Sequence, residues 1–219
     1  PCGCRVEDIR NAPAAQVNIV VDDTALPLAR KMRSAFGTPY VMFDKFAAPA
    51  RIAACYQTLF DALKLPQPAR LQTLRAQAEA AREEAARELR GVTYIYGNTP
   101  LRCYEFNRFM VELGMQPQVI QSNAILPEDE EDRAAILRHC DPYITKTANI
   151  APLQSIYDVL HPMLYLGHEY AARLRAKGIA LVRTDGVSNM LGYEITPFVT
   201  QALRAAAREA RALREGGAA

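Results

Sequence analysis

Residues 17–23 read VNIVVDD, an apolar run that ends in two acids. A helical pattern over 25–36 and a second apolar run over 40–44 follow it. Apolar residues at consecutive positions are typical of a strand that is buried on both faces of a parallel sheet. Ligands bind at the carboxyl ends of such strands, which makes Asp22 a candidate site residue.

The same alternation of strands and helices continues along the chain. It predicts an α/β fold with a Rossmann-like parallel sheet domain, helices on both faces, and part of a second similar domain in front of it. Strands are predicted near 17–22, 40–44, 92–97, 117–121, 142–146, 163–167 and 180–184. Helices are predicted near 25–36, 49–64, 68–90, 101–113, 129–139, 151–160, 169–177 and 194–214.

A proline pair within 66–68 interrupts the pattern before a long charged helix. The break predicts a partial Rossmann-like domain over 1–66 and a connecting helix over 67–90. A complete Rossmann-like domain is expected over 91–200, and a carboxy-terminal helix and tail over 201–219.

Composition excludes several classes of protein. The 26 Lys and Arg residues nearly balance the 24 Asp and Glu residues, and the two signs alternate along the predicted helices. No basic surface for nucleic acid is therefore expected. The apolar runs are shorter than the roughly 18 residues that span a bilayer, and no signal peptide is visible, so we expect no membrane contact and a cytoplasmic location.

The five cysteines stand at positions 2, 4, 55, 103 and 140. An odd, scattered set predicts reduced thiols rather than a disulfide framework. Cys2 and Cys4 form a C-x-C pair and are weak candidate metal ligands, although a loop at a frayed end is the simpler interpretation. The sequence offers no second pair nearby, so the cofactor stays unknown. A bound iron–sulfur cluster would need ligands from an absent half or a partner chain.

Polar residues stand at the predicted strand ends, where a crevice would collect them. Carboxylates outnumber cations among them, which favours a cationic, metal-bearing or neutral hydrogen-bonding ligand. For His168, Glu169 and Asp185, an alternative interpretation is a histidine at a helix start with a capping glutamate. The candidate ligand-binding residues are Asp22, Asn98, Thr99, His168, Glu169 and Asp185.

A second acidic stretch, PEDEED at 127–132, begins a predicted helix that ends in Arg138 and His139. Acids at the amino end and bases at the carboxyl end complement the helix dipole. We therefore expect this stretch to stabilise its helix rather than to bind a metal.

Several short matches, in order along the chain, resemble the nitrogenase component 1 superfamily. They include the strand 17–22, ARKM at 29–32, FGTPY at 36–40, ELGM at 112–115 and GYE at 192–194. The family includes the molybdenum–iron protein alpha chain and the scaffold for cofactor assembly. The resemblance covers the carboxy-terminal half of such chains. It implies an absent amino-terminal half and pairing with a homologous component 1 subunit or with a second copy.

The resemblance also implies changes at the active centre. Asp22 stands where the alpha chain has a cofactor-ligating cysteine, and Asp185 where it has a cofactor-ligating histidine. A nitrogen-reducing role is therefore not expected. Two hypotheses remain. One is a reductase subunit that acts on an organic or metallocofactor substrate with electrons from an ATP-dependent iron–sulfur partner. The other is a non-catalytic binding or cofactor-assembly module that retains the fold.

Overall fold

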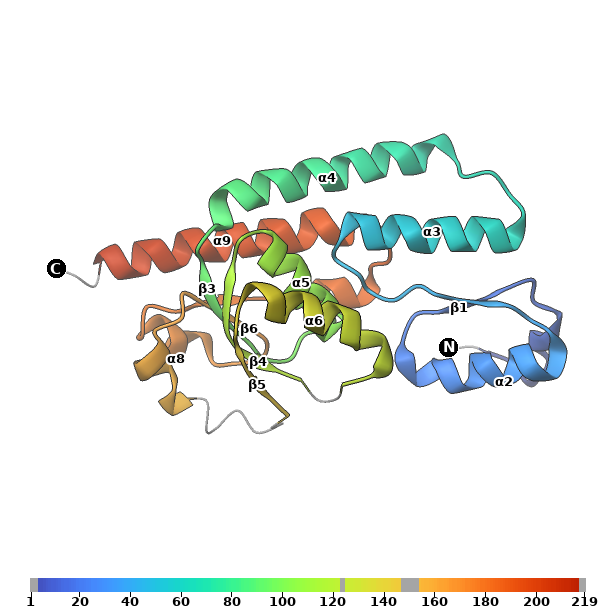
Figure 1. Cartoon of the computed structure of the whole chain (residues 1–219), viewed down its shortest axis with the longest axis horizontal. Coiled ribbons are helices and arrows are strands. Elements are labelled where there is room, and N and C mark those ends of the chain that lie inside the picture. Colours follow the sequence, from blue (N-terminus) through green and yellow to red (C-terminus); the bar gives the residue numbers. More distant parts are fainter. Residues whose placement is uncertain (1–3, 123–124, 147–153, 217–219) are drawn as a thin grey trace.

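The computed structural model describes residues 4–122, 125–146 and 154–216. These residues form two parallel sheets connected by helices (Figure 1). The α/β fold class is confirmed, and each strand lies within a predicted range except for the first residue of β4. The two-stranded sheet contains β1 (Asn18–Val20) and β2 (Tyr40–Met42), and the five-stranded sheet contains β3 (Thr93–Tyr96), β4 (Gln116–Gln121), β5 (Tyr143–Thr145), β6 (Leu164–Leu166) and β7 (Ala180–Val182).

Strand order in the larger sheet is β5-β4-β3-β6-β7, with every pair parallel. The chain therefore builds outward from β3 to β5 and then returns to place β6 on the other side of β3. This reversal makes the carboxyl ends of β3 and β6 the topological switch point. Open parallel sheets bind their ligands beside such a point.

Alternate residues of each strand point to opposite faces of the five-stranded sheet, and helices cover both faces. Tyr94 and Tyr96 pack into a core with α4 (Ala69–Leu89), α5 (Cys103–Glu112) and α9 (Ile195–Gly216). Ile95 and Tyr165 pack on the opposite side with residues of α7 (Tyr157–Leu160) and α8 (Ala171–Arg175). All four strand residues are at most 2% exposed, as a doubly covered parallel sheet requires.

The two-stranded sheet is covered differently. One face packs on α2 (Leu26–Phe36), where Val20, Leu26 and Ala29 form a small apolar cluster. Gly37 ends α2 with φ 74°, in the left-handed conformation that glycine adopts without strain. We call residues 4–48 the N-terminal segment, which includes α1 (Val6–Asn11).

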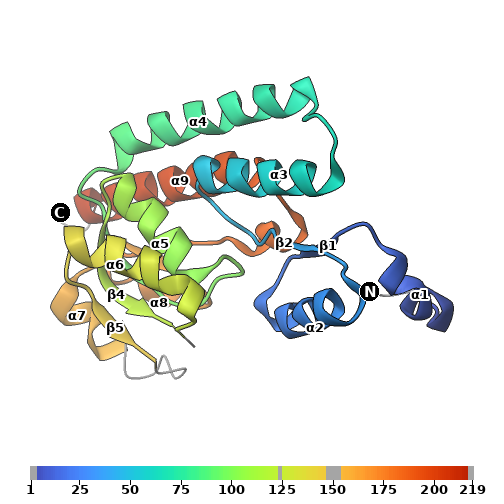
Figure 2. The ribbon, with the colours of Figure 1, turned by 45° about the vertical axis from the view of Figure 1, so that its right-hand side comes forward.

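Three long helices form a layer above both sheets (Figures 1 and 2). Helix α3 (Pro49–Leu63) and α4 form a hairpin, and α9 lies along α4. Figure 2 shows the N-terminal segment below α3 and the five-stranded sheet below the far end of α4.

The shorter elements complete the chain. Helix α6 (Glu130–His139) packs beside α5. Helix α7 begins later than the predicted 151–160, of which residues 151–153 lie outside the described residues. Helix α9 is continuous across the predicted boundary at 200/201. The 3-10 helices of the described residues include η1 (Ala12–Ala14), η2 (Asp23–Ala25), η3 (Pro127–Asp129) and η5 (Asp185–Asn189).

No helix in the described ranges has both the length and the apolar character needed to cross a membrane.

Candidate functional site

The six predicted ligand-binding residues line two pockets rather than one. Asp22, Asn98 and Thr99 line a pocket of about 350 Å³ at the carboxyl ends of β3 and β4. We call it the acidic pocket. His168, Glu169 and Asp185 line a second pocket, of about 410 Å³, at the carboxyl ends of β6 and β7.

The two pockets adjoin at a close backbone contact between β3 and β6. The Gly97 N–H donates to the Leu166 carbonyl oxygen at 2.7 Å. Gly167 has φ 134°, and a Cβ atom there would lie 2.8 Å from the Asn98 nitrogen. Glycine is therefore required at 167, and this contact lies at the switch point of the sheet.

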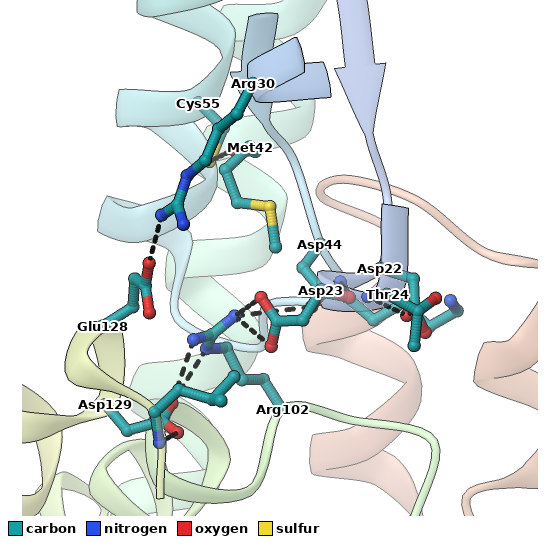
Figure 3. A network of polar contacts seen from close by, with 12 residues as sticks. Asp22, Asp23, Thr24, Arg30, Met42, Asp44, Cys55, Arg102, Glu128 and Asp129 are labelled. Atoms are coloured by element: carbon teal, nitrogen blue, oxygen red, sulfur yellow. Dashed lines mark hydrogen bonds and ion pairs between the residues drawn. The ribbon is translucent and has the colours of Figure 1, made fainter. Parts of the chain in front are cut away.

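A buried arginine organises the acidic pocket (Figure 3). Arg102 is 8% exposed and directly precedes α5. Its Nη1 donates to both Asp23 carboxylate oxygens, at 2.8 and 2.9 Å, and lies 3.7 Å from Asp44 Oδ2. Its Nε donates to Asp129 Oδ1 at 3.1 Å. Arg102 thus joins the N-terminal segment, through Asp23 and Asp44, to the start of α6 through Asp129.

The charges in this network do not balance. Three carboxylates surround one guanidinium, and the Asp129 side chain is only 8% exposed. Burial opposes the charge of Arg102, but its hydrogen bond to Asp23 and the nearby acids raise its pKa above the usual value. Burial raises the pKa of Asp44, against the opposing effects of the Lys45 N–H and Arg102. The pocket therefore has an excess of negative charge that favours a cationic or proton-donating ligand.

Asp22 is the N-cap of η2. Its Oδ1 accepts hydrogen bonds from the Thr24 hydroxyl at 2.6 Å and the Thr24 N–H at 2.8 Å. These two bonds lower the pKa of Asp22, so its carboxylate is ionised at neutral pH. The local turn therefore holds a negative charge at the edge of the pocket.

The strand-end loop after β3 supplies neutral polar groups. The Thr99 hydroxyl lies 2.8 Å from the Tyr96 hydroxyl and accepts from the Leu101 N–H at 3.3 Å. Asn98 is exposed and lines the same pocket. The loop can thus offer an amide from a position fixed by its neighbours.

Cys103 also lines the acidic pocket, but as a thiol. Burial raises its pKa to about 12, and its Sγ donates to the Gln121 carbonyl oxygen at 3.7 Å. An iron–sulfur cluster takes several thiolate ligands, whereas Cys103 is the one cysteine among the described residues that line this pocket. Across the described residues, no group of three or more His, Cys, Asp and Glu side chains has the geometry to hold a metal ion. The residues of this pocket do not fit an iron–sulfur cluster.

The C-x-C pair is only partly described. Cys4 is exposed and its Sγ donates to the Arg5 carbonyl oxygen at 3.6 Å, whereas Cys2 lies outside the described residues. Their role as metal ligands stays a prediction.

The second pocket contains one close pair. His168 Nε2 lies 3.6 Å from Asp185 Oδ1, and both side chains are largely exposed. Glu169 is different, because its side chain is only 4% exposed and its Oε1 accepts from the Tyr170 N–H at 2.7 Å. Tyr170 is the N-cap of α8, so Glu169 helps to fix the start of that helix. The pair His168 and Asp185 is the part of the predicted trio that faces solvent together.

The sequence alone did not identify three residues of the network, namely Arg102, Asp44 and Asp129. The acidic stretch at 127–132 was expected to stabilise its helix, yet Asp129 binds Arg102 and Glu128 binds Arg30 of α2 at 2.9 Å (Figure 3). A single arginine between a strand and a helix was the available signal. Its partners lie 79 and 27 positions away, beyond the reach of any local pattern.

Comparisons with known proteins agree with this architecture. Residues 1–199 match the family model described as nitrogenase component 1 type oxidoreductase. The chain therefore belongs to the nitrogenase component 1 type oxidoreductase family, and the predicted resemblance is confirmed. No curated protein sequence matches the chain.

Two solved structures show the same fold. "Nitrogenase Cp1 at pH 6.5" is similar to this chain with TM-score 0.79 and 15% identity, and the match covers 94% of this chain and 48% of that chain. "Nitrogenase Cp1 at pH 5" is similar with TM-score 0.60 and 15% identity, covering 92% of this chain and 48% of that chain. The chain thus spans about half the length of the solved nitrogenase chains that it matches.

Proposed function

We propose that this protein is part of a nitrogenase-like reductase that acts on an organic or metallocofactor substrate rather than on dinitrogen. Family membership supports a component 1 role. The observation that carries the finer proposal is the acidic pocket, which lies at strand carboxyl ends and presents carboxylates and neutral polar groups instead of thiolate ligands.

In this proposal the residues of the chain bind and orient the substrate. Asp22 supplies a fixed negative charge, and Asn98 supplies an amide that can donate or accept a hydrogen bond. Asp44 lines the pocket beside Arg102, and burial raises the pKa of its carboxyl group. Arg102 is a positioning residue, because its hydrogen bonds hold Asp23 and Asp129 in place.

The residues of the pocket do not fit an iron–sulfur cluster that could pass electrons to the substrate, so the electrons must come from a cluster held by other residues. We propose that an ATP-dependent iron–sulfur reductase component delivers them, through ligands supplied by a homologous component 1 subunit, a second copy, or sequence outside residues 1–219. We also propose a cytoplasmic location, and the division of the chain into a partial domain (1–66), a connecting helix (67–90), a complete domain (91–200) and a carboxy-terminal helix and tail (201–219).

A second candidate is a non-catalytic binding or cofactor-assembly module. The lining of the acidic pocket supports it, because its described residues supply one cysteine, and no group of three or more His, Cys, Asp and Glu side chains in the described ranges has the geometry to hold a metal ion. Such a module would bind its ligand in the acidic pocket without receiving electrons.

The test uses the protein purified anaerobically from its native source, with all associated chains, and mixed with the iron–sulfur reductase of the same source. A reductase subunit is expected to make reduced reductase oxidise in an ATP-dependent manner, without forming ammonia from dinitrogen. Asp22→Asn should slow this oxidation, and Asp8→Asn in exposed α1 is the matched control. Ammonia formation would contradict the proposal, and no ATP-dependent oxidation would favour the binding module.

A further inference from the structure

Three buried polar side chains lie in a line behind the contact that joins the two pockets. Tyr165 of β6 and Tyr157 of α7 are 0% and 1% exposed, and their rings meet edge to face with centroids 5.9 Å apart. The side chain of Glu169, which follows β6, is 4% exposed. Burial raises the pKa of Tyr157, and the Tyr165 hydroxyl and Glu169 carboxylate that it faces raise this pKa further. The line therefore runs from Glu169 through Tyr157 to Tyr165.

The hydroxyl groups of this line do not stabilise the fold. Neither Tyr157 nor Tyr165 makes a hydrogen bond of ordinary geometry to a group that the structure describes. On the opposite side of the sheet, the equally buried Tyr94 donates to Asn107 Oδ1 at 3.0 Å. Burying a hydroxyl without such a bond costs free energy, and phenylalanine would fill the same space without that cost. A buried polar group of this kind is a candidate for a catalytic role.

The line reaches both pockets. At one end, the Tyr165 hydroxyl lies against Gly97, where a Cβ atom would be only 2.5 Å from the hydroxyl oxygen. Gly97 lines the acidic pocket, so the hydroxyl lies directly behind the lining of that pocket. At the other end, Glu169 lines the second pocket together with His168 and Asp185, whose side chains are largely exposed. The line thus connects an open pocket to the lining of the acidic pocket.

The groups of the line can pass protons. Burial raises the pKa of Tyr165 to about 12, so its hydroxyl is protonated at neutral pH. A protonated hydroxyl can accept a proton on its oxygen as it gives up its own. Glu169 is held by the Tyr170 N–H, 2.7 Å from Oε1, and by Gln154 Nε2, 3.4 Å from Oε2. Arg173 Nη1 lies 3.8 Å from Oε1. Each carboxylate oxygen has two lone pairs, so Oε2 can also bind a proton.

We propose that Glu169, Tyr157 and Tyr165 form a proton relay from the second pocket to the substrate in the acidic pocket. The relay rests on the proposed reductase function, in which the iron–sulfur reductase supplies the electrons. A substrate atom that lies against Gly97 and has gained an electron pair takes the hydroxyl proton of Tyr165. Tyr165 takes the proton of Tyr157, Tyr157 takes one from Glu169, and Glu169 takes one from solvent. Each residue ends as it began, and one proton has passed from solvent to the substrate.

The first test measures turnover in the protein purified anaerobically with its associated chains, mixed with its iron–sulfur reductase and ATP. Solvent protons are the electron acceptor, and sustained oxidation of the reduced reductase is followed. Tyr165→Phe removes a hydroxyl that has no hydrogen bond, so the urea midpoint should not fall, whereas the oxidation should slow at least tenfold. Tyr94→Phe also removes a buried hydroxyl and should keep the wild-type rate.

The outcomes separate the relay from the reductase function. An unchanged rate in Tyr165→Phe, with an active wild type, would overturn the relay. An inactive wild type would contradict the reductase function, and a second measurement that needs no activity then decides whether the line carries protons.

That measurement labels the Cζ atom of tyrosine with ¹³C in this chain alone, and records the spectrum in equal parts of H₂O and D₂O. A hydroxyl that exchanges rapidly with solvent gives one line, and one that exchanges slowly gives two. Tyr157 and Tyr165 should each give one line in wild type and two in Glu169→Gln, whereas the bonded Tyr94 should give two in both. Two lines from Tyr165 in wild type, or one line in Glu169→Gln, would overturn the proposal.

Discussion

The two parallel sheets of this protein are built from similar strand sequences but are buried to very different extents. Strand β6 reads LYL, and all three residues are fully buried between two helical layers. Strand β1 reads NIV, and only Val20 is buried. The comparison shows that an apolar run specifies a strand, whereas the neighbours that cover it come from the topology of the whole fold.

The two regions are joined by polar contacts in addition to apolar packing. Arg102 binds both Asp23 of the N-terminal segment and Asp129 at the start of α6. Glu105, in the first turn of α5, accepts hydrogen bonds from the N–H groups of Ala47 and Ala48, which directly precede α3. The contact between the N-terminal segment and the five-stranded-sheet region therefore depends on charged side chains, and leaving a buried charge without its partner lowers stability.

The largest difference between the two regions should appear in their apolar cores. Phe109→Ala removes a fully buried ring from the core between the five-stranded sheet and helices α4, α5 and α9, and is expected to lower the free energy of unfolding by about 3–5 kcal/mol. Phe36→Ala, in the N-terminal segment, removes a ring that is 60% exposed and should change it by less than about 0.5 kcal/mol. Urea unfolding followed by circular dichroism measures both, and equal effects would contradict the comparison.

The buried ion pairs should have the next largest effect. Arg102→Met leaves Asp23, Asp44 and Asp129 without their shared cation and is expected to cost about 3 kcal/mol. Arg133→Met is the matched control, because Arg133 pairs with the exposed Glu130 within the same helix. Its cost should stay below about 0.5 kcal/mol in the same urea titration.

These contrasts also show what the sequence could predict. Runs of apolar residues predicted every strand among the described residues, since such a run is a local pattern that favours a strand. The Arg102 network and the burial of Glu169 were not predictable, because they depend on side chains that the fold brings together over long separations. The six predicted site residues were chosen by their position at strand ends, and the strand order then divided them between two pockets.

The stability of the contact between the two regions should also depend on pH, through Glu105. Burial raises the pKa of Glu105 to about 7, although the Ala47 and Ala48 N–H groups oppose the shift. The folded protein thus binds more protons than the unfolded chain between pH 4.5 and about 7, so stability falls as pH rises through this range. Glu105→Gln is expected to reduce this fall by about 1–3 kcal/mol. Urea titrations at pH 5, 6 and 7 measure this fall. If the free energy of unfolding falls equally with pH in wild type and Glu105→Gln, the prediction is wrong.

The smallest effect is expected at the exposed ion pair of Arg30 and Glu128, which also joins the two regions. Arg30→Ala and Glu128→Gln should leave the urea midpoint at 0.15 M salt unchanged within error, because water and salt screen exposed charges. A midpoint shift as large as that of Arg102→Met would show that the surface pair, and not the buried network, joins the regions.

The most direct test of the account is hydrogen exchange of wild type and Arg102→Met, resolved by peptide. The account predicts that the amides of β1 and β2 lose at least tenfold of their protection in the variant, while those of β3 and β6 keep theirs. Equal loss in all four strands, or no loss in β1 and β2, would contradict the claim that Arg102 holds the N-terminal segment against the five-stranded sheet.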